Sequence, residues 1–143
     1  MSDAKPPANP PAPVVLDLVW EGEKRFRGRA GGVEIVMDSA SQAGPSPVEA
    51  LAFALAGCIG IDLVVILTRG RFELRGLRAH LLAERAPEDP KRILAVDLRF
   101  TVAGEIPPDR VQRALDLSRQ TYCSVWHSLR QDIDLKTSFE IVG

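Results

Sequence analysis

Apolar and polar residues alternate along three short segments near the start of the chain, a pattern that predicts β-strands. The turns between them carry Glu21–Glu23 (EGE) and the pair Gly31-Gly32. Short turns of this kind join antiparallel neighbours, so we expect a three-stranded antiparallel sheet. Side chains two residues apart share a face of a strand, which places Arg25, Arg27 and Arg29 together. The three expected strands are Val14–Trp20, Lys24–Ala30 and Val33–Asp38.

The longest apolar segment, Ala50–Leu67, predicts a central helix. It follows Ser46–Glu49 (SPVE), which combines an N-terminal capping box with a proline in the first turn, and it should stop near Gly70. Asp62 is its only charged residue. A helix that is apolar nearly all round is buried on all sides. A small chain achieves this most easily between two copies, so we expect a homodimer.

The length of this apolar segment raises the question of a membrane span. Asp62 interrupts it, and the neighbouring segments alternate as they do in a mixed α and β domain. We therefore predict a buried core helix and no membrane partner.

The second half of the chain predicts two long strands, two helices and a final strand. Together the elements predict an α+β fold with N-terminal antiparallel strands, a long buried central helix, and a second antiparallel sheet region with two further helices. We assign residues 14–143 to one domain and residues 1–13, which contain five prolines, to a disordered Pro-rich tail. The expected elements are a strand Leu74–Glu84, a hairpin loop Ala86–Arg92, a strand Ile93–Val102, a helix opened by Pro107–Asp109, a short helix from about Tyr122 to Asp132, and a strand Ile133–Val142.

The composition limits which binding partners and which cellular compartment we expect. A net charge of −1 does not provide the excess of basic residues that binds nucleic acid. The N-terminal tail has no apolar region of the kind that secretory signals carry, so we expect a cytoplasmic protein. In that compartment a pair of cysteines is more often catalytic, redox-sensing or metal-binding than a structural disulfide.

The two cysteines are the main candidates for chemistry. Cys58 lies within the expected central helix, where a thiol in apolar surroundings is an inert core residue unless a cation is near. The concentrated source of cations is the arginine face of the second strand. Cys123 lies at the expected start of a short helix, where free amides and the helix dipole stabilise a thiolate. The spacing alone does not show that the two thiols meet.

Other polar residues suggest weaker alternatives. His127 follows Cys123 by one helical turn, so Cys58, Cys123 and His127 could be three zinc ligands, although a fourth ligand is missing. Asp62, one turn after Cys58, needs a partner inside a buried helix, and an arginine is the natural one. Glu49 is explained as the capping-box acid. No hydrolase triad, phosphate-binding loop or dinucleotide motif is present.

Two motifs are similar to those of the OsmC/Ohr family, in particular its YhfA-like branch. They are Ser46–Glu49 (SPVE) followed by Leu55–Asp62 (LAGCIGID), and Tyr122–Val125 (YCSV) followed by Ser128-Leu129. The similarity in element order extends from about Val14 to Gly143. It implies an intertwined homodimer with a swapped N-terminal sheet and two active sites at the interface.

The resemblance also implies the roles of the site residues. Cys58 attacks the peroxide, Cys123 resolves the product as a disulfide, an arginine holds the thiolate, and a glutamate orients that arginine. The hydroperoxide branch has its glutamate ten residues before the first cysteine, where this chain has Val48; Glu49 lies nine before it, as in the YhfA-like branch. We assign the arginine to Arg27, with Arg25 as the alternative.

The resemblance therefore implies a cysteine peroxidase that reduces organic hydroperoxides in the oxidative stress response, recycled by a dithiol or lipoyl-type reductant, and we expect no cofactor or metal. One alternative is a non-catalytic dimer of the same fold that senses redox state or binds a small hydrophobic ligand. The other is a zinc-stabilised structural dimer.

Overall fold

The computed structural model describes residues 9–143. The chain divides into two compact units, Met1–Val48 and Glu49–Gly143. The predicted Pro-rich tail lies partly outside the described residues, and residues 9–16 carry no helix or strand.

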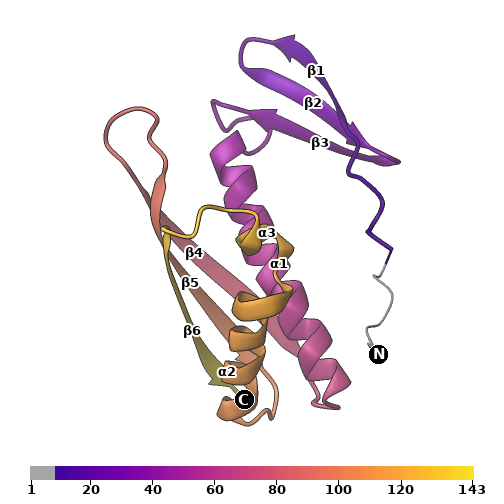
Figure 1. The fold of residues 1–143 in the computed structure, drawn as a ribbon, viewed down its shortest axis with the longest axis vertical. Helices are drawn as coiled ribbons and strands as arrows, with labels where there is room; N and C mark the ends of the chain where they lie inside the picture. The colour runs from indigo at the N-terminus through magenta and orange to yellow at the C-terminus, as the bar shows by residue number, and fades with distance from the viewer. Residues whose placement is uncertain (1–8) are drawn as a thin grey trace, which may run out of the picture. The chain divides into compact units, whose positions relative to one another are not determined.

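The first unit is built on the predicted antiparallel sheet (Figure 1). Its middle strand β2 places Arg27 opposite Val19 on β1 and Val36 on β3. β1 begins later than predicted: its pairing with β2 starts at Asp17 opposite Arg29, and β2 ends one residue later, before the Gly31-Gly32 turn. The strands are β1 (Asp17–Gly22), β2 (Arg25–Ala30) and β3 (Val33–Asp38).

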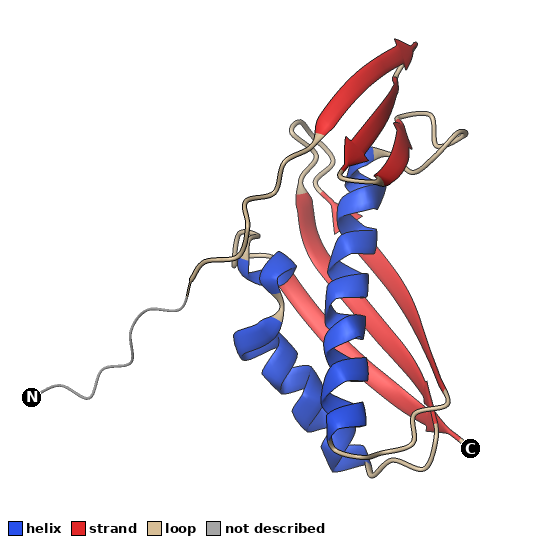
Figure 2. Cartoon of the chain, turned by 90° about the vertical axis from the view of Figure 1, so that its right-hand side faces the viewer, coloured by secondary structure: helices blue, strands red, loops and turns tan. Residues whose placement is uncertain are grey.

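The second unit packs its helices against one face of a second three-stranded sheet (Figure 2). The long helix α1 (Pro47–Arg69) begins in the predicted capping segment and ends before Gly70. The buried residues of α1 are spaced four apart, so they form one stripe along the same side of the helix. This stripe (Leu55, Ile59, Leu63 and Leu67) packs in one core with the inward face of β5 (Val96, Leu98, Phe100 and Val102). The sheet strands are β4 (Gly76–Arg85), β5 (Ile93–Ala103) and β6 (Asp134–Val142), in that order.

The last strand corrects the predicted antiparallel second sheet. β4 and β5 form the expected hairpin, but β6 runs parallel to β5. A parallel neighbour requires a crossover, and here the crossover consists of α2 (Pro108–Leu117), the π-helical turn η1 (Ser118–Tyr122) and α3 (Ser124–His127). Hydrophobic alternation reports the buried face of a strand and not its direction.

The second short helix is also shorter than predicted. α3 covers four residues, Ser124–His127, and the chain then turns toward β6. The side-chain amide of Gln131 donates to the carbonyls of Trp126 and Leu129 at 3.0 and 2.8 Å, so side-chain bonds replace the helical pattern there. Cys123 becomes the N-cap residue of this helix.

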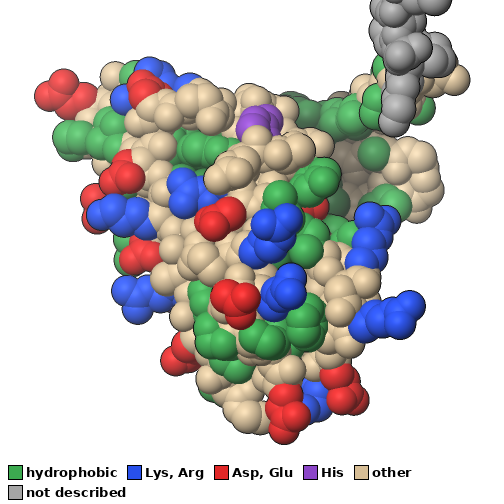
Figure 3. Space-filling view, turned by 60° about the horizontal axis from the view of Figure 1, so that its bottom comes forward, with side chains coloured by type: hydrophobic (Ala, Val, Ile, Leu, Met, Phe, Trp, Pro, Cys, Tyr) green, Lys and Arg blue, Asp and Glu red, His purple; other side chains and the backbone are tan. Residues whose placement is uncertain are grey.

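Within the single chain α1 is buried on one side only, so burial on all sides, which we expect from a second copy, stays a prediction. Phe53 is 72% exposed and Ile61 is 65% exposed, and both lie away from the buried stripe. By length and composition α1 could cross a membrane, with a mean hydropathy of 2.5 over its most apolar window. Its buried stripe is nevertheless the core of a mixed α and β fold. On the face shown in Figure 3, acidic and basic side chains are interspersed, in keeping with the small net charge.

Candidate active site

The structure brings the two cysteine thiols together. Cys58 lies on α1 and Cys123 lies 65 residues later, between η1 and α3, yet their Sγ atoms are within 4.8 Å of each other. Cys123 is fully buried, whereas Cys58 is half-buried. The pair thus contains one half-buried and one fully buried cysteine.

Burial controls the chemistry of Cys123. It raises the pKa of the Cys123 thiol to about 11, and the neighbouring Cys58 and Asp62 add to the rise. The Trp126 amide donates a hydrogen bond to Sγ at 3.3 Å, which lowers the pKa by less than burial raises it. The stabilisation that we predicted from the helix start is present in the Trp126 amide bond, but burial outweighs it and the net pKa is raised. Cys123 is a neutral thiol at neutral pH.

Asp62 completes the cluster. It follows Cys58 by one turn of α1, and a carboxylate oxygen lies within 4.8 Å of both sulfur atoms. Its partner is the hydroxyl of Ser118 on η1, which donates to Oδ2 at 2.7 Å. The arginine predicted for Asp62 is absent, since no ion pair among residues 9–143 involves this carboxylate.

Ser118 is the site residue that the sequence reasoning missed. It is fully buried, although serine is a polar residue. Its spacing from Val111 and Leu115 places it on the inward stripe of α2 as that helix continues into η1. A serine on the apolar stripe of a predicted helix was the available signal. The tertiary structure supplies the reason: Ser118 faces a carboxylate from another helix.

The zinc-ligand set of Cys58, Cys123 and His127 is not assembled. His127 is exposed and does not belong to the cluster of possible ligand atoms, where Asp62 stands instead. That cluster offers three ligands, whereas a structural zinc site takes four. Within the described part of the chain, the predicted structural zinc site therefore has no support.

Glu49 lies far from the thiols of its own chain. It is nine residues before Cys58 on one regular helix, so the two are separated by ~13 Å along the axis and by half a turn around it. Glu49 lines an open hollow of about 260 Å³ beside β4, with Ala52, Phe53, Ala56, Ala79 and Leu81. A single α1 helix therefore cannot bring Glu49 and Cys58 into one site.

The candidate arginines lie on β2, in the other unit. Arg27 pairs with Glu21 at 3.0 Å and with Glu34 at 3.7 Å, and the hydrogen bond and charge of Glu21 raise its pKa further. Arg25 lies 3.9 Å from Asp38, whose pKa is lowered chiefly by the amides of Ala43 and Ala40. Arg27 keeps a partly exposed guanidinium and is always charged.

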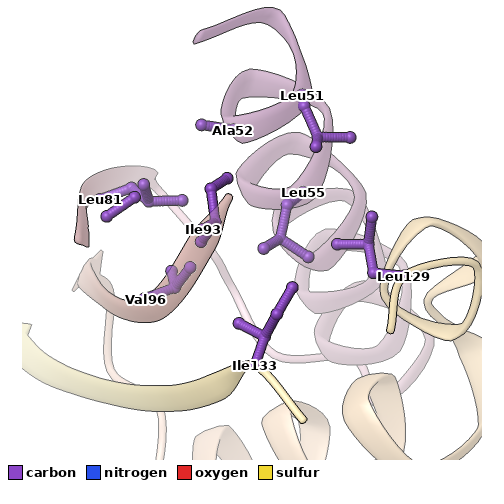
Figure 4. Close-up of a pocket in the computed structure, with 9 residues that line it drawn as sticks. Leu51, Ala52, Leu55, Leu81, Ile93, Val96, Leu129 and Ile133 are labelled. Carbon is purple, nitrogen blue, oxygen red and sulfur yellow. The ribbon is translucent and has the colours of Figure 1, made fainter. Parts of the chain in front are cut away.

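An apolar cavity lies between α1 and the second sheet (Figure 4). It is a candidate site for the small hydrophobic ligand of the alternative function. Residues Leu51, Leu55, Val96, Leu129 and Ile133 are among those that point into it. Its volume is only about 10 Å³, the space of a single water molecule. This cavity cannot hold a lipid-like molecule.

Known proteins share both the sequence and the fold. The chain is 37% identical over 127 residues to Protein YhfA of Escherichia coli, covering 87% of this chain and 95% of that protein. The fold matches a hypothetical protein from Aquifex aeolicus with a TM-score of 0.85 at 24% identity, covering 92% and 97% of the two chains. It also matches an organic hydroperoxide resistance protein from Elizabethkingia anophelis with a TM-score of 0.67 at 12% identity, covering 94% and 100%.

The family itself follows from the sequence. The profile described as "OsmC-like protein" matches residues 39–138, a segment that contains both cysteines, Asp62 and Ser118. Sequence identity to YhfA extends the likeness over most of the chain. The resemblance expected from the two cysteine motifs is confirmed: this chain belongs to the OsmC-like family.

Proposed function

We propose that this protein is a thiol peroxidase that reduces organic hydroperoxides through a Cys58 sulfenic acid and a Cys58–Cys123 disulfide. The observation that carries the proposal is the approach of the two Sγ atoms to within 4.8 Å. Organic hydroperoxide resistance proteins among the structures of this fold add support.

The exposure of the two thiols supports their separate roles. Cys58, which is half-buried, is the thiol that a substrate can reach. Its thiolate attacks the terminal oxygen of the hydroperoxide and the O–O bond breaks. The alkoxide leaves with a proton as the alcohol, and Cys58 becomes a sulfenic acid.

The buried thiol then closes the cycle. The Sγ atom of Cys123 attacks the Cys58 sulfur, a disulfide forms, and water leaves. The two sulfur atoms must close to ~2 Å for this bond to form. A dithiol or lipoyl-type reductant then reduces the disulfide and restores both thiols. We place this cycle in the cytoplasm, where such reductants are maintained.

A cation is needed to stabilise the Cys58 thiolate. We assign this role to Arg27, with Arg25 as the alternative, and the orienting role to Glu49. Because Glu49 cannot reach Cys58 along its own helix, we propose that two copies of the chain form a homodimer in which one copy completes the site of the other. The exposed side of α1, which includes Phe53 and Ile61, supports this arrangement, since it is an apolar surface on the helix that carries Cys58.

Ile61→Lys should separate this dimer. A lysine at the centre of an apolar interface is a buried charge without a partner, which costs several kcal/mol and should weaken association by at least ~100-fold. Sedimentation equilibrium measures the effect, with circular dichroism as the check on folding. Gln112→Lys, on the exposed side of α2, is the matched control and should leave the mass unchanged. A monomeric wild type, or a fully dimeric Ile61→Lys variant, would refute the proposed interface.

Thiol titration with intact mass tests the peroxidase itself. One equivalent of cumene hydroperoxide should remove both thiols and lower the mass by two hydrogen atoms, because one disulfide forms. Excess dihydrolipoamide or dithiothreitol should then sustain peroxide loss over many turnovers. Thiols that remain reduced under these conditions would exclude the peroxidase.

A redox sensor on the same thiols is the second candidate. The raised pKa of Cys123 favours it, because a resolving thiol that is rarely ionised forms its disulfide slowly. The same titration separates the two functions by rate: a sensor whose disulfide forms slowly consumes peroxide only slowly, even with excess dithiol.

A further inference from the structure

We propose that Asp62 accepts the proton of Cys123 as this thiol attacks Cys58, and that Ser118 positions the Asp62 carboxylate for this step. The inference deepens the proposed thiol chemistry by assigning the proton transfer on which disulfide formation depends.

The buried thiol needs a proton acceptor. With a pKa of about 11, Cys123 is ionised in only about one molecule in ten thousand at pH 7. The thiolate, and not the thiol, attacks a sulfur atom. A base that removes the proton during the attack makes the reaction independent of this small population.

Asp62 is placed to be that base. One of its carboxylate oxygens lies within 4.8 Å of both sulfur atoms, a gap that one bridging water or a small side-chain rotation closes. The hydroxyl of Ser118, on η1, donates a hydrogen bond to Oδ2 of Asp62 at 2.7 Å. This bond limits the rotation of a carboxylate that lies beside the thiol pair.

No cation in the same unit competes for the carboxylate. Arg119, the residue after Ser118, instead donates to the carbonyl of Leu135 at 2.8 Å and to the hydroxyl of Thr137 at 3.3 Å. His127 is exposed. None of the ion pairs among the described residues involves Asp62.

The proposed step balances. The proton of the Cys123 thiol passes to Asp62 while the S–S bond forms and the S–O bond of the Cys58 sulfenic acid breaks. The leaving hydroxide takes the proton back from Asp62 and departs as water. A thiol and a sulfenic acid give a disulfide and water, and the carboxylate is regenerated.

A charge effect of Asp62 would act in the opposite direction. A nearby negative charge raises the pKa of Cys123, so removing it without loss of a base would produce more thiolate and a faster attack. Loss of a general base makes the attack slower. Whether the rate falls or rises when Asp62 is replaced therefore distinguishes a proton acceptor from a residue that acts only through its charge.

The aromatic disulfide DTNB tests the step without peroxide. Cys58 should release one thionitrobenzoate in a first phase, and Cys123 should release the second by closing the disulfide. The leaving thionitrobenzoate needs no proton, so the second phase reports only the loss of the Cys123 proton. Cys123→Ser should remove the second phase, which assigns it.

At pH 7, Asp62→Asn should slow the second phase by ~10- to 100-fold, whereas the first phase, which needs no transfer of the Cys123 proton, should not slow. Its second-phase rate should rise about tenfold per pH unit from pH 6 to 9, as the Cys123 thiolate does, whereas the wild type should change less. Ser118→Ala keeps the carboxylate and should produce a smaller loss. Asp109→Asn, an exposed carboxylate on α2, is the control and should have no effect.

An unchanged or faster second phase in Asp62→Asn would overturn the inference. If Asp62→Asn does not fold by circular dichroism, Ser118→Ala decides, and a second phase at the wild-type rate in that variant counts against the role. The peroxidase can fail separately: a wild type inert to cumene hydroperoxide, with a slowed second phase in Asp62→Asn, would refute the peroxidase and retain the proton acceptor.

Discussion

Replacing Cys58 with serine should abolish peroxide consumption. A serine hydroxyl does not ionise at neutral pH and forms no sulfenic acid, so the first bond in the proposed cycle cannot be made. We expect the steady-state rate with cumene hydroperoxide and dihydrolipoamide to fall by at least ~1,000-fold, to the level of the reaction without protein.

The substitution is small enough to keep the fold. Cys58 is half-buried beside the core stripe of α1, and serine differs from cysteine by one atom. Circular dichroism and the thermal midpoint check that the variant is folded. If folded Cys58→Ser sustains many turnovers, Cys58 is not the residue that reacts with peroxide.

Replacing Cys123 with serine should allow one turnover and then stop the cycle. Cys58 is still oxidised, but no thiol is present to condense with the sulfenic acid. Intact mass should show the gain of one oxygen atom per chain, and a dimedone adduct should form at Cys58. Peroxide loss should stop at about one equivalent when a bulky dithiol is the reductant.

The serine preserves the local structure around this position. Cys123 is the N-cap of α3 and its Sγ accepts the Trp126 amide, a role that a serine hydroxyl fills well. Sustained turnover by this variant would mean that an external thiol, and not Cys123, resolves the sulfenic acid in the normal cycle.

Local patterns in the sequence were sufficient for most elements. The capping segment at Ser46–Glu49 and the following apolar run predicted α1 to within a few residues, because both signals act within one helical turn. The alternation along Ile93–Val102 identified the buried face of β5 for the same reason. The direction of β6 was beyond such reasoning, because strand pairing depends on where a crossover returns the chain.

The chemistry of the site divides in the same way. Sequence motifs by themselves singled out Cys58 and Cys123 as candidates and identified the family, since residue type and short spacing carry that information. Tertiary structure alone decided that the thiols meet, that Asp62 binds Ser118 and not an arginine, and that burial of Cys123 outweighs the amides of α3. Desolvation and contacts between distant helices depend on packing in three dimensions, which the order of residues along the chain does not display.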